Sequence, residues 1–435
     1  MRLPATLRAL QYRNFQLFFG GQFISLIGTW MQNVAQAWLV YRITGSSVLL
    51  GAVGFSGQIP VFLLAPLGGI VADRWQRRRV VVATQTSAML LAFTLAALTL
   101  TGTVRVWHIF VLSALLGAVY AFDIPARQSF IVEMVGKQDL MNAIALNSSM
   151  FNASRVIGPA IAGILVASIG EGWCFFANAA SYIAVIAGLL LMRVSRREIP
   201  LYGESPVANV VEGFRWVIGN RAVHSLLLLL AVVSLAGMPY TVLMPIFADR
   251  ILHGGAKALG VLMGAAGIGA LVGALLLASR THLKGLNRWV GLSAMSFGML
   301  LVAFGYSRVY WLSALLLGFV GFSVMIENGS SNTLIQSMVP DHLRGRVMSV
   351  YSMMFMGMAP IGSLIAGALA DRVGAPMTVA SGGALCAACA GVFLAFLPHI
   401  RVDARRLIVA QQMAAGDPPQ EATGGGVEVE QADPR

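Results

Sequence analysis

Residues 69–79 read Gly-Ile-Val-Ala-Asp-Arg-Trp-Gln-Arg-Arg-Arg and follow directly on a long apolar segment. The first four residues are small or apolar, whereas five of the remaining seven are charged, four of them arginines. A hydrophobic helix that ends in a cluster of arginines is typical of a transmembrane span that leaves the bilayer on its cytoplasmic side. The stretch therefore predicts a helical membrane protein and places this arginine-rich loop in the cytoplasm.

The composition of the whole chain also indicates a membrane protein. Of its 435 residues, 57% are hydrophobic before the 47 glycines are counted, and 11% are charged, whereas about 25% of the residues of soluble domains are charged. A soluble fold of this composition could not cover its surface with polar groups. A soluble enzyme, a secreted disulfide-stabilised domain and a disordered chain are therefore excluded. The three cysteines are interpreted as packing residues and not as a metal site.

Apolar segments long enough to cross a bilayer, which takes about 20 helical residues, recur twelve times along the chain. The sequence therefore predicts an all-α membrane protein with twelve transmembrane helices. They are expected near residues 15–41, 48–72, 80–101, 106–126, 142–168, 173–193, 223–247, 256–279, 286–305, 310–332, 346–370 and 376–397.

The distribution of basic residues predicts the orientation of these spans. With twelve spans both ends of the chain lie on one side, and 23 of the 30 lysines and arginines fall in the termini and loops of that side, against six on the other. By the positive-inside rule both termini are cytoplasmic, and we expect the protein in the cell inner (cytoplasmic) membrane. The net charge of +12 thus reflects membrane orientation, and no nucleic-acid partner is expected.

The two halves of the chain are similar in sequence at an offset of 204 residues. Trp107 aligns with Trp311 and Gly170 with Gly374, and the 64 positions that these pairs bound stay in register without a gap. An internal repeat of six helices predicts two pseudo-symmetric bundles with a binding site between them. The expected divisions are an N-terminal six-helix bundle (1–193), a cytoplasmic linker with an amphipathic helix (194–221), a C-terminal six-helix bundle (222–398) and a disordered cytoplasmic tail (399–435).

Three motifs give the chain a resemblance to a known family over about residues 10–398. The arginine-rich loop is similar to the signature G-x-L-A-D-R-x-G-R-K of the major facilitator superfamily, with Gln76 in place of the second glycine. The second motif, Gly158-Pro159-x-x-x-Gly163, resembles one found in antiporters of this superfamily. The third, Asp123-Ile-Pro-Ala-Arg127 with Arg344-Gly-Arg346, resembles the enterobactin exporter and drug:proton antiporter subfamily.

The resemblance implies a secondary active exporter that moves a small amphiphilic molecule, a drug or a siderophore-like compound, out of the cytoplasm by alternating access coupled to proton influx. An importer or a flippase of a lipid-like solute with the same fold, and a membrane sensor without transport activity, are the alternatives. Because the sequence has no G-x-x-x-x-G-K-[ST] motif, the energy must come from a gradient. We expect no enzymatic activity, cofactor or metal. The expected partners are the substrate, protons and membrane lipids, and the expected state is a monomer.

The arginine-rich loop has a second interpretation beyond topology. Gly68 and Gly69 carry no side chain, so another helix can approach closely, and the Asp73 carboxylate suits the N-terminus of a neighbouring helix, which the resemblance implies is the eleventh span. Arg74 and Arg77 could reach acids on adjacent helices. Together with Arg127, these residues would form a latch that closes the cytoplasmic side in one conformation. The alternative is that the arginines only contact lipid headgroups.

Two acids lie inside predicted spans, where a charge is costly and should face a partner or a water-filled cavity. Asp123 and Glu327 are equivalent under the offset of 204. For Asp123 we expect a structural pair with Arg127 or with the arginine-rich loop, and proton transport is the alternative. Glu327 has no basic residue within one helical turn. Proton coupling and a latch with Arg280 or Lys284 therefore both stay open for it.

Polar stripes on two predicted spans are candidates for a substrate cavity. Arg155 lies near the middle of the fifth span on one stripe with Asn152 and Pro159, and it either pairs with an acid or meets an anionic substrate. A second stripe, on the first span, is expected to line the central cavity, and hydrogen bonding between helices is its alternative. Its members are Gln22, Ser25, Thr29, Gln32 and Gln36, with Asn33 beside them.

The distribution of basic residues generates a first testable prediction. Tags fused to both ends of the chain should be protected from protease in intact spheroplasts and cleaved after lysis, because both termini are expected in the cytoplasm. Cleavage of either tag from outside would overturn the predicted topology and the latch with it.

Overall fold

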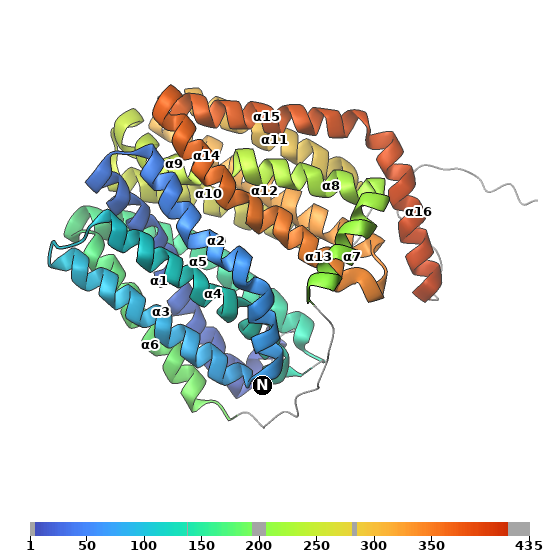
Figure 1. Ribbon diagram of the computed structural model, residues 1–435, viewed down its shortest axis with the longest axis horizontal. Coiled ribbons are helices and arrows are strands. Elements are labelled where there is room, and N and C mark those ends of the chain that lie inside the picture. Colours follow the sequence, from blue (N-terminus) through green and yellow to red (C-terminus); the bar gives the residue numbers. More distant parts are fainter. Residues whose placement is uncertain (1–4, 137, 194–205, 281–284, 416–435) are drawn as a thin grey trace, which may run out of the picture.

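The computed structural model describes residues 5–136, 138–193, 206–280 and 285–415, and every regular element in these ranges is a helix. The helices fall into two groups, one formed by the first six long helices and one by the helices that follow α7 (Figure 1). Contacts within each group are extensive, whereas the main contacts between the groups join α2 to α14 and α5 to α10.

The N-terminal group consists of η1 (Ala5–Gln11), α1 (Arg13–Thr44), α2 (Ser47–Arg74), α3 (Arg77–Leu100), α4 (Val106–Val135), α5 (Leu140–Ile169) and α6 (Glu171–Leu191). The C-terminal group consists of α8 (Arg221–Val232), η2 (Val233–Gly237), α9 (Tyr240–Ile246), η3 (Phe247–Ile251), α10 (Gly255–Ala278), α11 (Leu286–Tyr306), α12 (Tyr310–Met338), α13 (Asp341–Ser352), η4 (Met353–Gly357), α14 (Met358–Val373) and α15 (Ala375–Ala395). The segments η2, η3 and η4 are π-helical. We call the end of the molecule where α1 begins and α15 ends the terminal face, and the opposite end the distal face.

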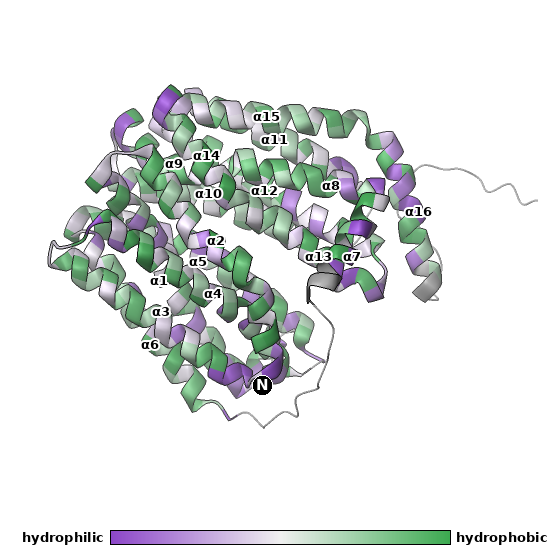
Figure 2. Cartoon of the chain, viewed as in Figure 1, coloured by the Kyte–Doolittle hydropathy of each residue, from purple (hydrophilic) through white to green (hydrophobic). Residues whose placement is uncertain are grey.

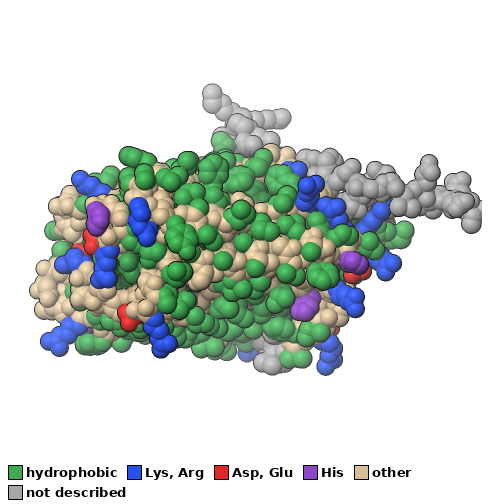
Figure 3. Space-filling model, turned by 90° about the horizontal axis from the view of Figure 1, so that it is seen from above, with side chains coloured by type: hydrophobic (Ala, Val, Ile, Leu, Met, Phe, Trp, Pro, Cys, Tyr) green, Lys and Arg blue, Asp and Glu red, His purple; other side chains and the backbone are tan. Residues whose placement is uncertain are grey.

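Eleven helical stretches in the described ranges are long and apolar enough to cross a membrane, and each coincides with a predicted span. Large apolar side chains such as Leu63, Ile164 and Leu190 are more than half exposed. Apolar residues cover the flanks of the molecule, and Lys and Arg side chains gather towards its two ends (Figures 2 and 3). Lipid is the solvent that suits such a belt, so the chain is a multi-pass membrane protein.

The helix α1 is not one of these eleven stretches. Its 32 residues exceed the about 20 that a bilayer requires, but its amide and hydroxyl side chains make it more polar than the other long helices. It packs along α5 and α6. Because α1 lies within the N-terminal group, it has the place of a first span, and the count of twelve stays a prediction.

The two groups meet most closely at four glycines near the distal face. A Cβ on Gly163 of α5 would lie 2.9 Å from the Cα of Gly260 in α10, and a Cβ on Gly51 of α2 would lie 3.1 Å from the Cα of Gly367 in α14. Small residues let helices approach closely where no hydrophobic effect drives association in lipid. We call these four residues the glycine seam.

The glycine seam follows the internal repeat of the sequence. Gly163 and Gly367 are equivalent under the offset of 204, and each meets a glycine in the first turns of a helix from the other group, Gly260 in α10 and Gly51 in α2. The same contact is therefore made twice, once on each side of the interface between the groups.

Two further helices lie at the terminal face. The amphipathic helix expected in the linker is present as α7 (Pro206–Gly219), which packs on α13, and Arg346 Nη1 lies 2.5 Å from Glu212 Oε2. The prediction of a disordered tail from residue 399 is wrong for its first part, because α16 extends over Leu397–Ala415. Ile400, Ala404 and Ile408 recur at four-residue spacing and are buried, which explains the helix. Residues 194–205 and 416–435 lie outside the described residues.

The tight packing of the seam generates a second prediction. A methyl group at Gly51 would clash with the Ser363 carbonyl oxygen, so Gly51→Ala should destabilise the protein by about 1–3 kcal/mol, the usual cost of overpacking. The measurement is the midpoint of thermal unfolding of the purified protein in detergent. Gly20→Ala is the matched control, since nothing lies within 4 Å of the added Cβ. Equal midpoints for both variants would contradict the prediction.

Candidate functional site

Asp123 lies in α4 within a saturated polar network of the N-terminal group. The residue is 1% exposed. Its Oδ1 accepts hydrogen bonds from Thr84 Oγ1 at 2.8 Å and from Gln85 Nε2 at 2.9 Å, both in α3. Its Oδ2 lies 3.3 Å from Arg127 Nε. The predicted pair with Arg127 is thus confirmed, and this acid is fixed by a positive charge and two neutral donors.

Glu327, the equivalent acid of the C-terminal group, has a different environment. The residue is 0% exposed. Ser331 Oγ donates a hydrogen bond to its Oε1 at 3.4 Å, and its Oε2 has no hydrogen-bond partner among the described residues. Arg280, one of the two cations considered for a latch, stacks instead on the ring of Trp289, with its guanidinium carbon 3.7 Å from the ring centroid. The other, Lys284, lies outside the described residues.

The contrast between the two acids limits what each can do. Asp123 can lose its charge only if Arg127 is left without its partner, which is costly in a buried site. Glu327 has no such constraint in the described part of the chain, and an ionised carboxylate without a counter-ion is expensive to bury. Glu327 is therefore the acid of the pair whose environment suits the uptake and release of a cation or a proton.

The arginine-rich loop is only partly organised as predicted. Arg77 Nη1 lies 3.1 Å from Glu133 Oε1 in α4 and donates to the Ser129 carbonyl oxygen at 3.0 Å, so Arg77 does reach an acid on a neighbouring helix. The side chain of Asp73 is 76% exposed, and Arg77 Nη2 lies 3.8 Å from its Oδ1. The expected contact between Asp73 and the N-terminus of the eleventh span is absent from the described residues.

The close helix approach expected at Gly68 and Gly69 is made at one of the two. An added Cβ at Gly69 would meet nothing within 4 Å, whereas one at Gly68 would clash with the Ala121 carbonyl oxygen of α4. Gly68 and not Gly69 thus allows a close helix approach in this conformation. The side chain of Arg74 is exposed, which leaves headgroup contact or a latch in another conformation open.

The amide stripe of α1 faces the interior of the N-terminal group over much of its length. Gln22, Ser25 and Gln32 are buried, and Asn178 Nδ2 of α6 donates to Gln32 Oε1 at 2.7 Å. The prediction that these three line a cavity is wrong in this conformation. For Gln32 the alternative of hydrogen bonding between helices is confirmed.

The remaining residues of the stripe have mixed environments. Gln36 Nε2 donates to Ser113 Oγ of α4 at 2.9 Å, and Thr29 Oγ1 donates to the Ser25 carbonyl oxygen at 3.0 Å. Asn33 is exposed. Of the first-span candidates, Asn33 therefore has the accessibility that a substrate contact requires.

The polar stripe of α5 lies at the interface between the two groups. Asn152 is 7% exposed and donates to the Ser148 carbonyl oxygen at 2.9 Å. Arg155 is partly exposed, and its guanidinium carbon lies 5.8 Å from the centroid of the Trp30 ring. None of the acids in the described ranges lies within ion-pair distance of Arg155, so the expected alternative of a carboxylate partner is not found there.

The Gly-Pro motif of α5 provides close helix packing next to Arg155. A Cβ on Gly158 would lie 2.5 Å from the Cβ of Trp30, and the carbonyl oxygen of the buried Pro159 faces Gly260 of α10. With Gly163 in the glycine seam, the motif packs α5 against α1 on one side and against α10 on the other. Its observed function is thus close helix packing beside Arg155.

The distal face is closed by side chains that the sequence did not single out as a group. Tyr41 Oη at the end of α1 donates to Asp249 Oδ2 in η3 at 2.7 Å, and Arg250 Nη2 donates to the Gly45 carbonyl oxygen at 3.0 Å. We call these four residues the distal clasp. Two adjacent charges just after a predicted span, Asp249 and Arg250, are the signal for this contact in the sequence.

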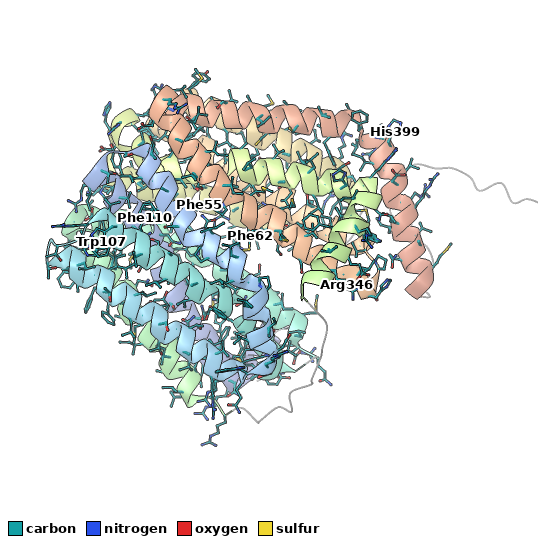
Figure 4. The ribbon with its side chains drawn as sticks, in the orientation of Figure 1. Phe55, Phe62, Trp107, Phe110, Arg346 and His399 are labelled. Atoms are coloured by element: carbon teal, nitrogen blue, oxygen red, sulfur yellow. The ribbon has the colours of Figure 1, made fainter. Side chains whose placement is uncertain are left out.

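An aromatic contact joins the groups farther from the distal face. Phe62 of α2 points towards the C-terminal group (Figure 4), and a Cβ on Gly357 of η4 would lie 2.6 Å from its ring. In Figure 4, Arg346 of α13 lies well away from the labelled residues of α2. The two groups therefore touch over their distal halves, and α13 pairs with α7 at the terminal face.

Comparison with known proteins identifies the family. Residues 5–420 match the family described as transmembrane secretion effectors. The chain therefore belongs to this family of the major facilitator superfamily, as the motifs indicated, and it is a transporter and not an enzyme.

Three relatives show what the chain is similar to. The staphyloferrin A transporter of Staphylococcus aureus is 26% identical over 360 residues, covering 82% of this chain and 89% of that protein. The multidrug efflux pump Tap of Mycolicibacterium fortuitum is 27% identical and covers 86% and 93%. The enterobactin exporter EntS of Shigella boydii is 26% identical and covers 85% and 88%.

A solved structure supports the fold independently. A point mutant of the nucleoside transporter NupG superposes with a TM-score of 0.70 and 14% identity over 88% of this chain and 99% of that chain. This similarity shows a shared transporter fold.

The contrast between the saturated and the exposed carboxylate generates a third prediction. Asp123→Asn should lower the thermal midpoint of the purified protein by several degrees, because Arg127 loses its partner in a buried network. Asp73→Asn should leave the midpoint within error, because an exposed pair contributes little to stability. A midpoint for Asp123→Asn equal to that of Asp73→Asn would show that the network contributes little to stability.

Proposed function

We propose that the chain is a secondary active exporter with twelve spans in two pseudo-symmetric six-helix bundles, residing in the inner membrane with both termini in the cytoplasm. In this proposal α1 is the first span and brings the count to twelve. The N-terminal bundle covers 1–193, and the linker of 194–221 holds the C-terminal bundle of 222–398 in place through α7. It moves a small amphiphilic molecule, a drug or a siderophore-like compound, out of the cytoplasm. Two relatives named as exporter or efflux pump support this direction.

The observation that carries coupling to protons is the environment of Glu327. The carboxylate is fully buried and has only a serine hydroxyl at 3.4 Å. Protonation neutralises this carboxylate without requiring a basic side chain beside it. Proton uptake from outside and release inside would then supply the energy, since the sequence has no nucleotide-binding loop. Asp123 keeps its charge through Arg127 and serves as a structural element.

Alternating access would exchange contacts between the two faces. In the present conformation the distal clasp joins the groups, and Asp73 is exposed. In the opposite conformation the clasp opens, and Asp73, Arg74 and Arg77 latch the terminal face against the start of α13. The exposed state of Asp73 here agrees with a latch that is made in one conformation only.

An importer is the second candidate. The fold is shared with the nucleoside transporter NupG, so the fold does not determine direction. A flippase of a lipid-like solute is equally compatible with this fold. A sensor without transport activity would need neither Glu327 nor Arg155.

The fourth prediction tests the function and its coupling together. Everted membrane vesicles that contain the protein should accumulate one or more compounds from a panel of siderophores, macrolides and cationic dyes, and a proton uncoupler should abolish the accumulation. Glu327→Gln should lose gradient-driven accumulation and keep counterflow exchange, because glutamine preserves the shape of the side chain and cannot exchange a proton.

Glu212→Gln is the control, because Glu212 belongs to a half-exposed ion pair at the terminal face and lies outside the spans. A Glu327→Gln protein that still concentrates substrate in a proton-dependent way would contradict coupling at this residue. Accumulation in right-side-out vesicles and not in everted vesicles would favour the importer.

A further inference from the structure

The membrane interior of this chain contains a cation that no described protein group neutralises. Arg155 lies midway along α5, and neither a carboxylate nor a hydrogen-bond acceptor of the described residues contacts its guanidinium. Arginine keeps its charge in any protein environment, so Arg155 cannot be neutralised by losing a proton, as Glu327 can by gaining one. The charge requires an anion or water at this position.

The groups around Arg155 are hydrogen-bond donors and aromatic surfaces. The Trp30 ring lies 5.8 Å from the guanidinium carbon and packs edge-on against Phe151, with ring centroids 5.6 Å apart and Phe151 44% exposed. None of the described residues accepts a hydrogen bond from the Trp30 indole N–H. Trp30 is held in this position by Gly158, which leaves room for its Cβ.

A third donor comes from the other helix group. Tyr240 of α9 is 3% exposed, its hydroxyl makes no hydrogen bond to the described residues, and it is close enough to Arg155 for an electrostatic interaction. Arg155 therefore lies near one further donor of its own group, Trp30, and one of the other group, Tyr240, and none of the three donates a hydrogen bond to the described residues. Gly267 of α10 packs on the Arg155 carbonyl oxygen, which places the site at the interface of the groups.

We propose that Arg155, Trp30 and Tyr240 form a binding site for the anionic group of an aromatic substrate. A carboxylate, or another planar anionic oxygen pair, accepts two parallel hydrogen bonds from the guanidinium fork, and the Tyr240 hydroxyl and the Trp30 N–H complete its coordination. The aromatic part of the substrate packs on Trp30 and the exposed face of Phe151. Because donors come from both groups, the anion connects them while it is bound.

This inference rests on the proposed function for its biological meaning, but it makes a statement about binding alone. It also favours one class within the proposed substrates. A cationic dye would meet an unpaired like charge at Arg155, whereas an anionic siderophore-like compound with an aromatic ring would supply the missing charge.

The fifth prediction uses three probes that share a naphthalene ring, have similar size and differ in charge: 2-naphthoate, 2-naphthamide and 2-naphthylmethylammonium. Isothermal titration of the purified full-length protein in detergent should give 2-naphthoate an affinity at least about tenfold higher than that of 2-naphthamide, the ratio expected for one charge-assisted hydrogen bond. The ammonium probe should bind weakest. Equal dissociation constants for the three probes would overturn the proposal.

Variants separate the site from general apolar binding. Arg155→Gln should remove the preference for 2-naphthoate, and Arg155→Lys should retain part of it, because a point charge replaces the bidentate fork. Tyr240→Phe should weaken 2-naphthoate by a smaller factor and leave 2-naphthamide unchanged. Ser149→Ala, on an exposed position of the same helix, is the control. If Arg155→Gln does not fold, Tyr240→Phe and the probe series in the unmodified protein still decide the outcome.

Failure of this proposal and failure of the proposed function are distinguishable. The titration needs no membrane, gradient or direction, so a carrier that proves to be an importer or not to use protons could still prefer 2-naphthoate. Conversely, efflux from everted vesicles with no charge preference in the titration would leave the exporter intact and remove the anionic site.

Discussion

A charged side chain inside a hydrocarbon layer must find a partner, and this constraint organises the interior of the molecule. Asp123, Glu327 and Arg155 lie within the spans, and the chain resolves these three charges in three different ways. Asp123 is neutralised by Arg127 and two neutral donors. Glu327 is left with a serine. Arg155 is left with aromatic rings and further donors. The first solution makes a rigid element, and in the proposed function a proton and an anionic substrate complete the other two.

The proposed sites at Glu327 and Arg155 lie in different helix groups, and this separation would matter for a coupled carrier. Glu327 is enclosed in the C-terminal group, whereas Arg155 belongs to α5 and faces the interface. An occupant at Arg155 would touch both groups, and an occupant at Glu327 would touch one. In the proposed carrier, coupling between them would pass through the packing of the C-terminal group and not through direct competition for one residue, because each site has its own chemistry.

The sequence was sufficient for the fold because its signals are strong and repeated. Long apolar segments and clustered arginines strongly indicate transmembrane helices. The repeat also predicts that Gly163 and Gly367 have equivalent positions. The site was harder to predict. A stripe of amides on α1 has the same periodicity whether it faces a cavity or another helix, and only the position of Asn178 in α6 showed that Gln32 bonds to a neighbour. Likewise, the short apolar repeat of α16 was hidden in a segment rich in charge.

Contacts that depend on the conformation could not be derived from spacing at all. Asp73 matches its motif, yet here it is exposed, because a motif records which contacts are possible and not which are made at one time. Trp30 and Tyr240 lie 210 positions apart in the chain, and neither has a local pattern that points to Arg155. Trp30 reaches Arg155 through the packing of α1 on α5, and Tyr240 lies near Arg155 across the interface between the groups. A one-dimensional periodicity contains neither arrangement.

The glycine seam has a mechanical consequence. It brings the backbones of the two groups closest at two points, and in the proposed alternating access the groups would turn about the line that joins these points. This line would act as a hinge axis close to the distal face. From Gly163 to the start of α5 at Leu140 the helix is about 35 Å long at 1.5 Å per residue, so a rotation of about 10° would displace that end by roughly 6 Å. In the proposed motion the seam would be the fulcrum of a lever whose short arm ends at the distal clasp, so small movements at the clasp would be amplified at the opposite face.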